Sequence, residues 1–449
     1  MGKFFGTDGV RGVANRDLTA DLALRLGSAA ARVLLTRPHG VKVLIGRDPR
    51  ISGDMLESAL AAGFASRGAD IILVGAIPTP GVACLVKEAD VDVGCVISAS
   101  HNPVDYNGIK FFGHDGEKLA DETESEIESH LDDPISQDLP IGENIGRFWR
   151  QPQRVERYAY AVKQTCRARL TGMKLVIDGA NGAAYDLAPR LFRELGAEVV
   201  TIGCDPDGNN INAGVGSTHP ERMLEMIARE GADAGLAFDG DADRVLMGSE
   251  KGELVDGDKI MAICGISMAR RGALPGNAVV ATVMSNMGLE VALRENGLVL
   301  DRVDEVGDRY VAERMRKMGY RIGGEKSGHI ILSDYTTTGD GMVTGLQVLS
   351  AMQESGQSLS ELAAVMTEFP QVLDGVRVKD KTGWDEKPVI QNAIREAQQI
   401  LEGRGRLHVR PSGTEPLIRV MAEGPDEQEL RQIINEVCCA IRENVGAAE

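Results

Sequence analysis

The chain has 449 residues, which is too long for one hydrophobic core and predicts about two to four domains. Its hydrophobic content of 43% is typical of a globular protein and excludes a disordered chain. With 67 acidic and 49 basic residues the net charge is -18, so a general affinity for nucleic acid or for a membrane surface is excluded, whereas a local basic pocket for an anion is not.

Cysteine usage and the first residues indicate the compartment. The seven cysteines are scattered and form no Cys-x-x-Cys pair, so neither a zinc ribbon nor a redox pair is supported. The opening MGKFFGTDGVRG lacks the apolar run of a secretory signal. No uncharged apolar stretch reaches the roughly 18 residues that a membrane span needs. We therefore expect a cytoplasmic protein with no membrane partner and no nucleic-acid partner.

A pattern of strand, helix, strand, helix and strand occurs three times along the chain. The first strands of the three copies are VKVLIGRD (41–48), MKLVIDGA (173–180) and NAVVATVMSN (277–286). The third strands are VDVGCVISAS (91–100), ADAGLAFDGD (232–241) and YRIGGEKS (320–327). This order predicts an α/β fold of three similar domains, each with a mixed, mainly parallel sheet covered by helices on both faces.

After Pro370 the pattern changes to a strand, a helix, two strands and a last helix, which predicts a smaller C-terminal α+β domain. The predicted domains are 1–150, 151–255, 256–368 and 369–449. Two local features accompany them. The acidic segment ESEIESHLDD (124–133) is interpreted as a solvated helix face or a linker. A capping box from Thr218 to Glu221 predicts the start of a helix that Gly231 ends.

The third strand of each copy ends in polar residues, and ligands of parallel α/β sheets bind beyond the carboxyl ends of strands. The first of these loops is SASHN (98–102). Ser100 is either a nucleophile or the start of a turn before Pro103, and the Gly-x-Ser-x-Gly elbow of hydrolases is absent. Lys110 follows in NGIKFF and could place a cation near the same loop.

The second loop is DGDADR (239–244), with carboxylates at alternate positions. Asp239, Asp241 and Asp243 would repel one another if packed together, and a hard divalent cation removes that repulsion. The alternatives are a solvated acidic turn or an EF-hand loop. An EF-hand is excluded, because its sixth position needs glycine and the sequence has Arg244. The residue types favour Mg²⁺ or Ca²⁺.

Two further loops carry ligand-binding residue types. In GGEKSGH (323–329), Glu325 and Ser327 could bind hydroxyl groups, although a simple turn is the favoured interpretation of the segment by itself. The N-terminal FGTDGVRG holds Arg11, which is either an anion contact or part of a turn.

The C-terminal domain contributes RPSGTEP (410–416). The Arg410 guanidinium, the hydroxyls of Ser412 and Thr414, and the N–H of Gly413 could form an anion nest, to which Arg419 adds a second guanidinium. The alternative is a turn that connects two strands. Beside a metal loop and a candidate nucleophile, phosphate binding is favoured.

Taken together, these segments resemble the α-D-phosphohexomutase superfamily. TDGVRG, SASHNP, DGDADR, GEKSGH and RPSGTEP stand in the order of that family and span nearly the whole chain. The forms FGTDGVRG and ISASHNPVDYNGIKFF resemble the subgroup that acts on glucosamine phosphates. The resemblance implies four domains around a central cleft and an intramolecular transfer of a phosphoryl group.

The resemblance also implies the roles of the site residues. Ser100 would be the phosphoserine, and one Mg²⁺ per chain would be bound by Asp239, Asp241, Asp243 and a phosphoryl oxygen on Ser100. Residues around the reacting group would be Arg11, His101, Lys110 and Arg244. Glu325 and Ser327 would bind the sugar. The non-reacting phosphate would be held by Arg410, Ser412, Gly413, Thr414 and Arg419.

The implied reaction converts glucosamine 6-phosphate to glucosamine 1-phosphate through a 1,6-bisphosphate that turns round in the site. Glucosamine 1,6-bisphosphate or a related hexose bisphosphate would serve as activator, and the resemblance favours a homodimer. GDRYVAERM (307–315) differs from the hexose-type sequences expected there, which favours the amino sugar. Alternatives are a phosphoglucomutase or phosphomannomutase, a non-catalytic sugar-phosphate binding protein, and a serine-dependent phosphatase.

Overall fold

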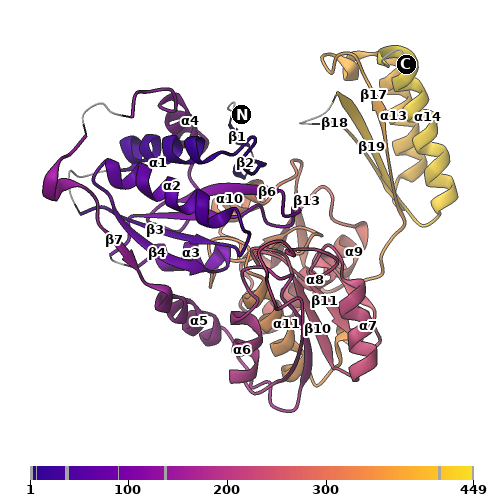
Figure 1. The fold of residues 1–449 in the computed structure, drawn as a ribbon. Coiled ribbons are helices and arrows are strands. Elements are labelled where there is room, and N and C mark those ends of the chain that lie inside the picture. Colours follow the sequence, from indigo (N-terminus) through magenta and orange to yellow (C-terminus); the bar gives the residue numbers. More distant parts are fainter. Residues whose placement is uncertain are drawn as a thin grey trace. The chain divides into compact units, whose positions relative to one another are not determined.

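The computed structural model describes residues 4–6, 8–35, 40–88, 90–135, 139–412 and 416–446. It comprises two compact units, one of residues 1–284 with 298–365 and one of residues 285–297 with 366–449. The described residues form three mixed α/β sheets in the first unit and an antiparallel sheet in the second (Figure 1). This arrangement confirms the predicted fold class.

The first sheet has the order β1-β2-β6-β5-β3-β4-β7. Its strands are β1 (Phe5–Gly6), β2 (Gly9–Val13), β3 (Lys42–Arg47), β4 (Asp70–Ala76), β5 (Val93–Ile97), β6 (Tyr106–Phe112) and β7 (Phe148–Arg150). The pairs β5–β3, β3–β4 and β4–β7 are parallel, and β5–β6, β6–β2 and β2–β1 are antiparallel. The helices around it are α1 (Ala20–Leu34), α2 (Gly53–Ser66), α3 (Thr79–Val86), α4 (Asp121–Ser129) and α5 (Val155–Gln164).

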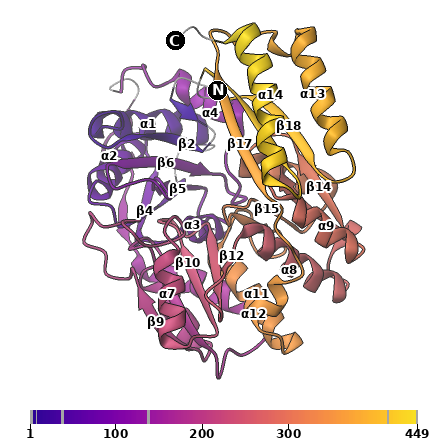
Figure 2. The ribbon, with the colours of Figure 1, turned by 90° about the vertical axis from the view of Figure 1, so that its right-hand side faces the viewer.

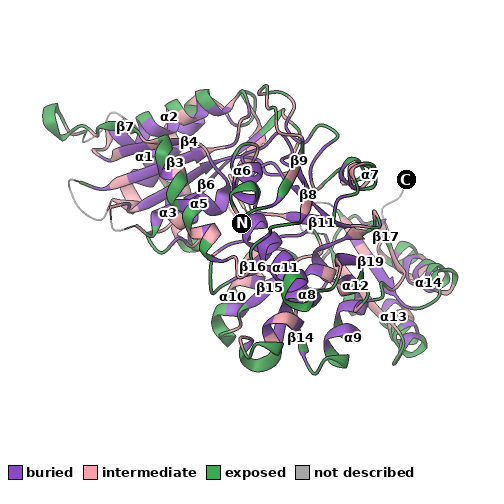
Figure 3. Cartoon of the chain, turned by 90° about the horizontal axis from the view of Figure 1, so that it is seen from below, coloured by how far each residue is buried: buried purple, intermediate pink, exposed green. Residues whose placement is uncertain are grey.

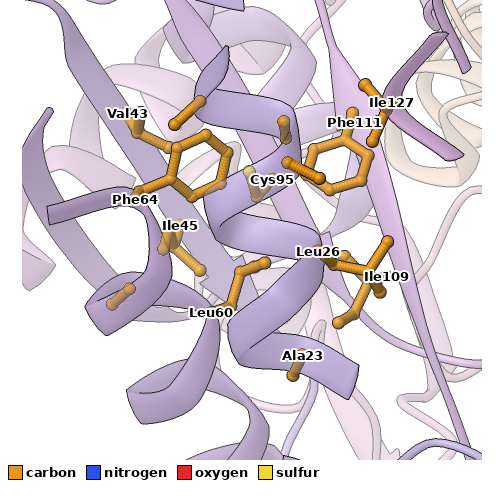
Figure 4. Packing of buried hydrophobic residues seen from close by; sticks show 14 of the residues in the cluster. Ala23, Leu26, Val43, Ile45, Leu60, Phe64, Cys95, Ile109, Phe111 and Ile127 are labelled. Carbon is orange, nitrogen blue, oxygen red and sulfur yellow. The ribbon is translucent and has the colours of Figure 1, made fainter. Parts of the chain in front are cut away.

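Helices α1 and α2 pack closely against each other over this sheet. A Cβ at Gly27 would lie 2.3 Å from the Leu60 carbonyl oxygen, so the two helices approach at a point that only glycine allows. Figure 4 shows Leu26 and Leu60 from these helices in one apolar cluster with Ile45 and Phe111 from the strands. This core fixes the strand ends from which the first loop emerges.

The second sheet has the order β12-β11-β10-β8-β9. Its elements are β8 (Lys174–Asp178), α6 (Leu187–Glu194), β9 (Glu198–Ile202), α7 (Glu221–Glu230), β10 (Ala234–Phe238), β11 (Val245–Ser249) and β12 (Leu254–Val255). Gly231 ends α7 in the left-handed conformation, as predicted. The predicted capping box is not formed, because Pro220 occupies the N-cap position and no side chain caps the helix.

The third sheet has the order β14-β13-β15-β16. Its strands are β13 (Ala278–Thr282), β14 (Val299–Val303), β15 (Ile322–Gly324) and β16 (Ile330–Leu332). The helices are α8 (Gly257–Arg270), α10 (Asp308–Met318), α11 (Gly341–Ser355) and α12 (Leu359–Ala363). Short 3₁₀ turns of the chain are Gly142–Asn144, Pro152–Arg154, Pro275–Asn277 and Trp384–Glu386.

The three α/β sheets share one feature that positions the site. In each, a strand that pairs in parallel with an inner neighbour is followed by an antiparallel partner, in the pairs β5–β6, β10–β11 and β15–β16. The hairpin connections are residues 98–105, 239–244 and 325–329. The candidate loops therefore lie at the carboxyl ends of the third strands, where the sequence places them.

The second unit contains the smaller antiparallel sheet, in the order β17-β19-β18. Its elements are α9 (Met287–Glu295), β17 (Gln371–Arg377), α13 (Pro388–Leu401), β18 (Arg406–Pro411), β19 (Leu417–Glu423) and α14 (Glu427–Val445). Helices α13 and α14 lie side by side on this sheet (Figure 2). Their outward faces are exposed, as the green ribbon in Figure 3 shows, while Ile390, Val420 and Ile434 form the core.

The predicted solvated face of the acidic segment (124–133) is confirmed in part. The acidic segment is only partly solvated, since Glu124 on α4 is 9% exposed and Ile127 is fully buried. Arg309 from the third sheet's domain also approaches Glu124, with Nη2 3.8 Å from Glu124 Oε2. Among the described residues, none of the helices has the length and apolarity to cross a membrane.

Candidate active site

Ser100 lies in a turn that its neighbours hold in an uncommon backbone conformation. Its φ of 53° is in the left-handed region, which costs a non-glycine residue on the order of 1 kcal/mol or more. The carbonyl oxygen of Ser100 accepts hydrogen bonds from Arg50 Nη2 at 3.0 Å and from Asn212 Nδ2 at 2.9 Å. Such a conformation, imposed by surrounding contacts, is typical of functional sites.

A buried ion pair between Asp48 and Arg50 contacts the backbone of this turn. Asp48 and Arg50 are fully buried, and Arg50 Nε donates to Asp48 Oδ2 at 2.9 Å. The Ser98 hydroxyl also donates to Asp48 Oδ2 at 2.6 Å and accepts the Ser100 N–H at 2.9 Å. Burial raises the pKa of Asp48, although Arg50 and Ser98 oppose this. Sequence analysis missed this pair, and the charged RDPR after the first predicted strand was its signal.

The Ser100 side chain points at the acidic loop of the second sheet. Its Oγ donates to Asp239 Oδ2 at 2.6 Å and lies 3.2 Å from His101 Nδ1. Burial, together with Arg244 and Arg11, lowers the pKa of His101 to about 4, so its imidazole is neutral at neutral pH. The hydroxyl therefore lies between a carboxylate and a proton acceptor.

The acidic loop has the composition of a metal site. Asp239, Asp241 and Asp243 are buried, and one oxygen atom from each lies within 4.8 Å of the others. Burial raises the pKa of Asp239 well above its usual value, and the other two carboxylates raise it further. Within the described residues, Asp241 Oδ1 and Asp243 Oδ1 have no hydrogen-bond partner. Clustered buried carboxylates that keep oxygens without hydrogen bonds fit a hard divalent cation.

Helix α3 fixes the middle carboxylate of this loop. The Thr79 hydroxyl donates to Asp241 Oδ2 at 2.7 Å, and the Thr79 N–H donates to the Asp241 carbonyl at 2.9 Å. By contrast, Glu250 accepts the Ser360 N–H at 3.1 Å and has no part in the loop. This confirms that the segment is not an EF-hand, whose twelfth residue would be a ligand.

Cations surround the carboxylates. Lys110 Nζ lies 3.2 Å from Asp241 Oδ2 and is 2% exposed. Although burial lowers the pKa of Lys110, the carboxylates of Asp241, Asp8 and Asp243 outweigh burial and raise it, so the ammonium stays charged. The Arg244 guanidinium Nε lies 3.8 Å from Asp243 Oδ1, and the backbone N–H of Arg244 donates to Asp239 Oδ1 at 3.2 Å. The structure thus brings Lys110 and Arg244 together with Ser100 and His101.

The predicted sugar loop lies directly against the acidic loop. Arg244 pairs with His329 in an antiparallel bridge, and the Val245 N–H donates to the Gly328 carbonyl at 3.1 Å. A Cβ at Gly328 would be 2.2 Å from the Val245 carbonyl oxygen, so this position needs glycine. Ser327 Oγ donates to Glu325 Oε2 at 3.4 Å. Loops of the second and third sheets therefore share one site.

His329 joins the two loops electrostatically and was not singled out from the sequence, although it ends GGEKSGH. Its Nδ1 lies 3.5 Å from Asp243 Oδ2, and its Nε2 lies 3.3 Å from Asp308 Oδ2. Burial opposes the charge, but these two carboxylates raise the pKa of His329 to about 9. The Gly339 N–H lies 3.1 Å from Nε2 and could donate a hydrogen bond to it only if the ring were neutral. The charged ring is nevertheless favoured, because its attraction to two carboxylates is stronger than one hydrogen bond from an amide.

The C-terminal unit holds the predicted phosphate loop. Arg410 on β18 and Arg419 on β19 are direct cross-strand partners. Like charges at opposed positions are destabilising unless an anion compensates them. Burial lowers the pKa of Arg410, and Arg419 adds to this effect. Ser412 is buried and donates its N–H to the Leu417 carbonyl at 2.7 Å. The predicted residues Gly413 and Thr414 lie outside the described residues.

Models of one known protein family match nearly the whole chain. Four models of the phosphoglucomutase/phosphomannomutase family match successive segments: α/β/α domain I matches residues 2–137, domain II 156–252, domain III 256–369 and the C-terminal domain 375–439. The chain belongs to the phosphoglucomutase/phosphomannomutase family. The family assignment confirms the resemblance found in the sequence.

Relatives that match over nearly the full length share one named activity within this family. The chain is 52% identical over 438 residues to the phosphoglucosamine mutase of Desulforamulus reducens, covering 97% of this chain and 98% of that one. It is 53% identical over 439 residues to the phosphoglucosamine mutase of a Thermoanaerobacter species, covering 97% and 98%. Both matches cover nearly the full length of the chain.

Solved structures share the fold. A phosphoglucomutase/phosphomannomutase family protein from Burkholderia thailandensis matches with a TM-score of 0.81 at 26% identity, covering 98% of this chain and 97% of that one. The N-acetylphosphoglucosamine mutase of Aspergillus fumigatus, solved with GlcNAc-6P and magnesium, matches with a TM-score of 0.69 at 19% identity, covering 98% and 95%. An S69A variant of that Aspergillus enzyme was solved with glucose 1,6-bisphosphate.

Proposed function

We propose that this chain is an isomerase that interconverts glucosamine 6-phosphate and glucosamine 1-phosphate through a phosphoserine at Ser100. The observation that carries the proposal is the 2.6 Å hydrogen bond between Ser100 Oγ and Asp239, which brings a hydroxyl of the first sheet to the acidic loop of the second. The relatives that are about half identical over nearly the full length, all named phosphoglucosamine mutase, support the substrate.

The acidic loop is proposed to hold one Mg²⁺. The ligands would be Asp239, Asp241, Asp243 and, after phosphorylation, a phosphoryl oxygen on Ser100. When bound, the ion offsets negative charge on the transferred phosphoryl group. The Aspergillus enzyme, which was solved with magnesium, and the orphaned carboxylate oxygens here support this assignment.

The remaining groups of the site orient the transfer and stabilise its charge. Lys110, Arg244 and Arg11 supply positive charge around the phosphoryl oxygens, which is the main requirement of phosphoryl transfer. The phosphoryl group passes from Ser100 Oγ to the sugar 1-hydroxyl: the P–Oγ bond breaks as the bond from phosphorus to the sugar oxygen forms. The sugar hydroxyl loses one proton and Ser100 Oγ takes one up, so protons balance over the step. When the 6-phosphoryl group returns, the Oγ–H proton must leave, and neutral His101 at 3.2 Å is placed to accept it.

The sugar and its second phosphate are assigned to separate loops. Glu325 and Ser327 are proposed to bind sugar hydroxyls. The cross-strand pair of Arg410 and Arg419, with Ser412, Gly413 and Thr414, is proposed to hold the non-reacting phosphate. A hexose 1,6-bisphosphate is proposed as the activator, with the bisphosphate-bound Aspergillus structure in support. We also propose a cytoplasmic location and a homodimeric assembly.

The test is a parallel assay of the purified chain with the 6- and 1-phosphates of glucosamine, glucose and mannose, after priming with glucose 1,6-bisphosphate. We expect the highest kcat/KM with glucosamine phosphates and no turnover by Ser100→Ala. The control is Ser129→Ala, an exposed serine on α4, which should retain full activity.

Each alternative function predicts a different assay result. A preference for glucose or mannose phosphates would replace the substrate assignment by a phosphoglucomutase or phosphomannomutase. Steady release of inorganic phosphate without a primer would indicate a phosphatase. Sugar-phosphate binding without turnover by the primed wild-type chain would indicate a non-catalytic binding protein.

A further inference from the structure

Asp8 has no role in the proposed mechanism, but its carboxylate contacts three cationic side chains. It lies in the turn between β1 and β2, and its side chain is 23% exposed. Its carboxylate lies 2.9 Å from Lys110 Nζ and 2.7 Å from Lys118 Nζ, and it also accepts a hydrogen bond from Arg11 Nη2. Burial alone would raise the pKa of Asp8, but Lys110, Lys118 and Arg11 outweigh it and hold it well below its usual value.

The charges continue beyond Asp8 into the third sheet's domain. Lys118 Nζ lies 2.6 Å from Asp308 Oδ2, the first residue of α10. Asp308 in turn faces His329, which faces Asp243. On the other side, Lys110 lies beside Asp241. Positive and negative side chains thus alternate in a circuit that begins and ends at the acidic loop and passes through Asp8.

The circuit explains how several cations can be held so close together. The Lys110 side chain is buried, at 2% exposed, and that of Lys118 is partly buried, at 18% exposed. The two ammonium groups would repel each other and Arg11 without a shared counter-ion. The carboxylates of the acidic loop are committed to the divalent cation in the proposed function. Asp8 is a carboxylate outside that loop which contacts both of the cations assigned to the phosphoryl group, Lys110 and Arg11.

We propose that Asp8 is a positioning residue for phosphoryl transfer: it holds the Lys110 ammonium and the Arg11 guanidinium beside the acidic loop, while Lys118 ties it to Asp308 and the sugar loop. This inference rests on the proposed function, because it takes from it the roles of Lys110 and Arg11. Asp8 acts through these two cations and contacts no reacting atom. Phosphoryl transfer depends on positioned charge, so a misplaced cation slows transfer more than it weakens substrate binding.

The test compares Asp8→Asn with wild type as full-length protein phosphorylated with glucose 1,6-bisphosphate. Rapid-quench single turnover measures the rate constant for transfer to glucosamine 6-phosphate, and steady-state assays give KM. We expect the rate constant to fall about 100-fold while KM stays within about threefold. The affinity for Mn²⁺, measured by electron paramagnetic resonance, should stay within about threefold of wild type.

Matched variants separate positioning from a merely structural role. Asp132→Asn, at a carboxylate 92% exposed on the same domain, should leave all these values unchanged. If Asp8→Asn does not fold, Lys118→Gln carries the test, with an expected fall of about tenfold in the transfer rate constant at unchanged KM. In either variant, a wild-type rate constant in folded protein, or a raised KM alone, would overturn the proposal. Failure of wild type to transfer would instead refute the proposed function.

Discussion

Ser100 Oγ and Asp239 Oδ2 are joined by a 2.6 Å hydrogen bond, although the two residues stand 139 positions apart. The contact connects the hairpin loops of two separate α/β sheets. A Cβ at Gly240 would lie 2.4 Å from the Ser100 carbonyl oxygen, so the acidic loop presses directly on the serine turn. A hydroxyl and three carboxylates are thereby held in one buried cluster, which is the arrangement that a phosphoserine and a divalent cation require.

The acidic loop is expected to lose its metal when its middle carboxylate is neutralised. Asp241→Asn should weaken Mg²⁺ binding, measured by titration calorimetry, by at least about 100-fold, the upper end of what outer-shell changes cost. Asp205→Asn, at an exposed carboxylate of the same sheet's domain, is the control and should bind as wild type does. In wild type, Mg²⁺ should also raise the melting temperature. Equal affinity in both variants would refute the metal assignment.

The Arg50–Asp48 pair should be essential for the stability of the serine turn. Arg50→Met leaves the buried Asp48 carboxylate without its counter-ion, so we expect the free energy of unfolding to fall by about 3–5 kcal/mol in chemical denaturation. Arg16→Met is the matched control, because Arg16 pairs with Asp17 but is 71% exposed, and its loss should change stability little. Similar stability of the two variants would show that the buried pair does not hold the turn.

Glu124 should make stability depend on pH. Burial, with Asp8 adding and Lys118 opposing, raises its pKa to about 7 from a usual 4.5, and Arg309 also faces it. The folded state therefore binds this proton more tightly, and stability is lost as pH rises from about 4.5 to about 7. Glu124→Gln should remove a destabilisation on the order of 1 kcal/mol at pH 8, allowing for solvent screening, and almost none near pH 4.5.

Melting curves between pH 4.5 and pH 8 measure this effect. The melting temperature of Glu124→Gln relative to wild type should rise with pH. Glu126→Gln, at an exposed glutamate on the same helix, should show a constant difference. If the two variants follow the same pH dependence, Glu124 does not carry the raised pKa.

The cross-strand arginine pair of the C-terminal unit is expected to act in substrate binding. Arg410→Met removes one charge-assisted contact to the non-reacting phosphate, so KM should rise about 10- to 100-fold with a smaller change in kcat. Arg431→Met on α14, where Arg431 is 66% exposed and paired with Glu427, should leave both constants unchanged. A fall in kcat without a change in KM would place Arg410 in the chemical step instead.

Much of the fold could be predicted because its strands are short apolar runs that end in polar residues. The predicted first strand of the first copy, VKVLIGRD (41–48), contains β3 (Lys42–Arg47), and the third strands end where the loops begin. The loops could therefore be placed at strand ends from the sequence. The acidic segment contains the predicted helix with a solvated face, on which Glu126 is exposed, but its charge pattern does not show that Glu124 is buried and lies near Arg309, far along the chain.

The supporting residues of the site could not be predicted for a similar reason. Arg50 contacts the Ser100 carbonyl across 50 positions, and Lys118 contacts Asp308 across 190. Each is one charged residue in a loop, and nothing local distinguishes it from a solvated side chain. Their roles come from tertiary pairing, whereas the loop motifs combine residue types whose chemistry is readable in a few consecutive positions.

The most direct test of a phosphoserine at Ser100 is peptide mapping by mass spectrometry. The protein is incubated with glucose 1,6-bisphosphate and Mg²⁺ and then chased with glucosamine 6-phosphate. We predict one phosphoryl group on the peptide that contains Ser100, lost during the chase as glucosamine bisphosphate appears. A phosphoryl group on another residue, or turnover of glucosamine phosphates with Ser100 unmodified throughout, would contradict the account.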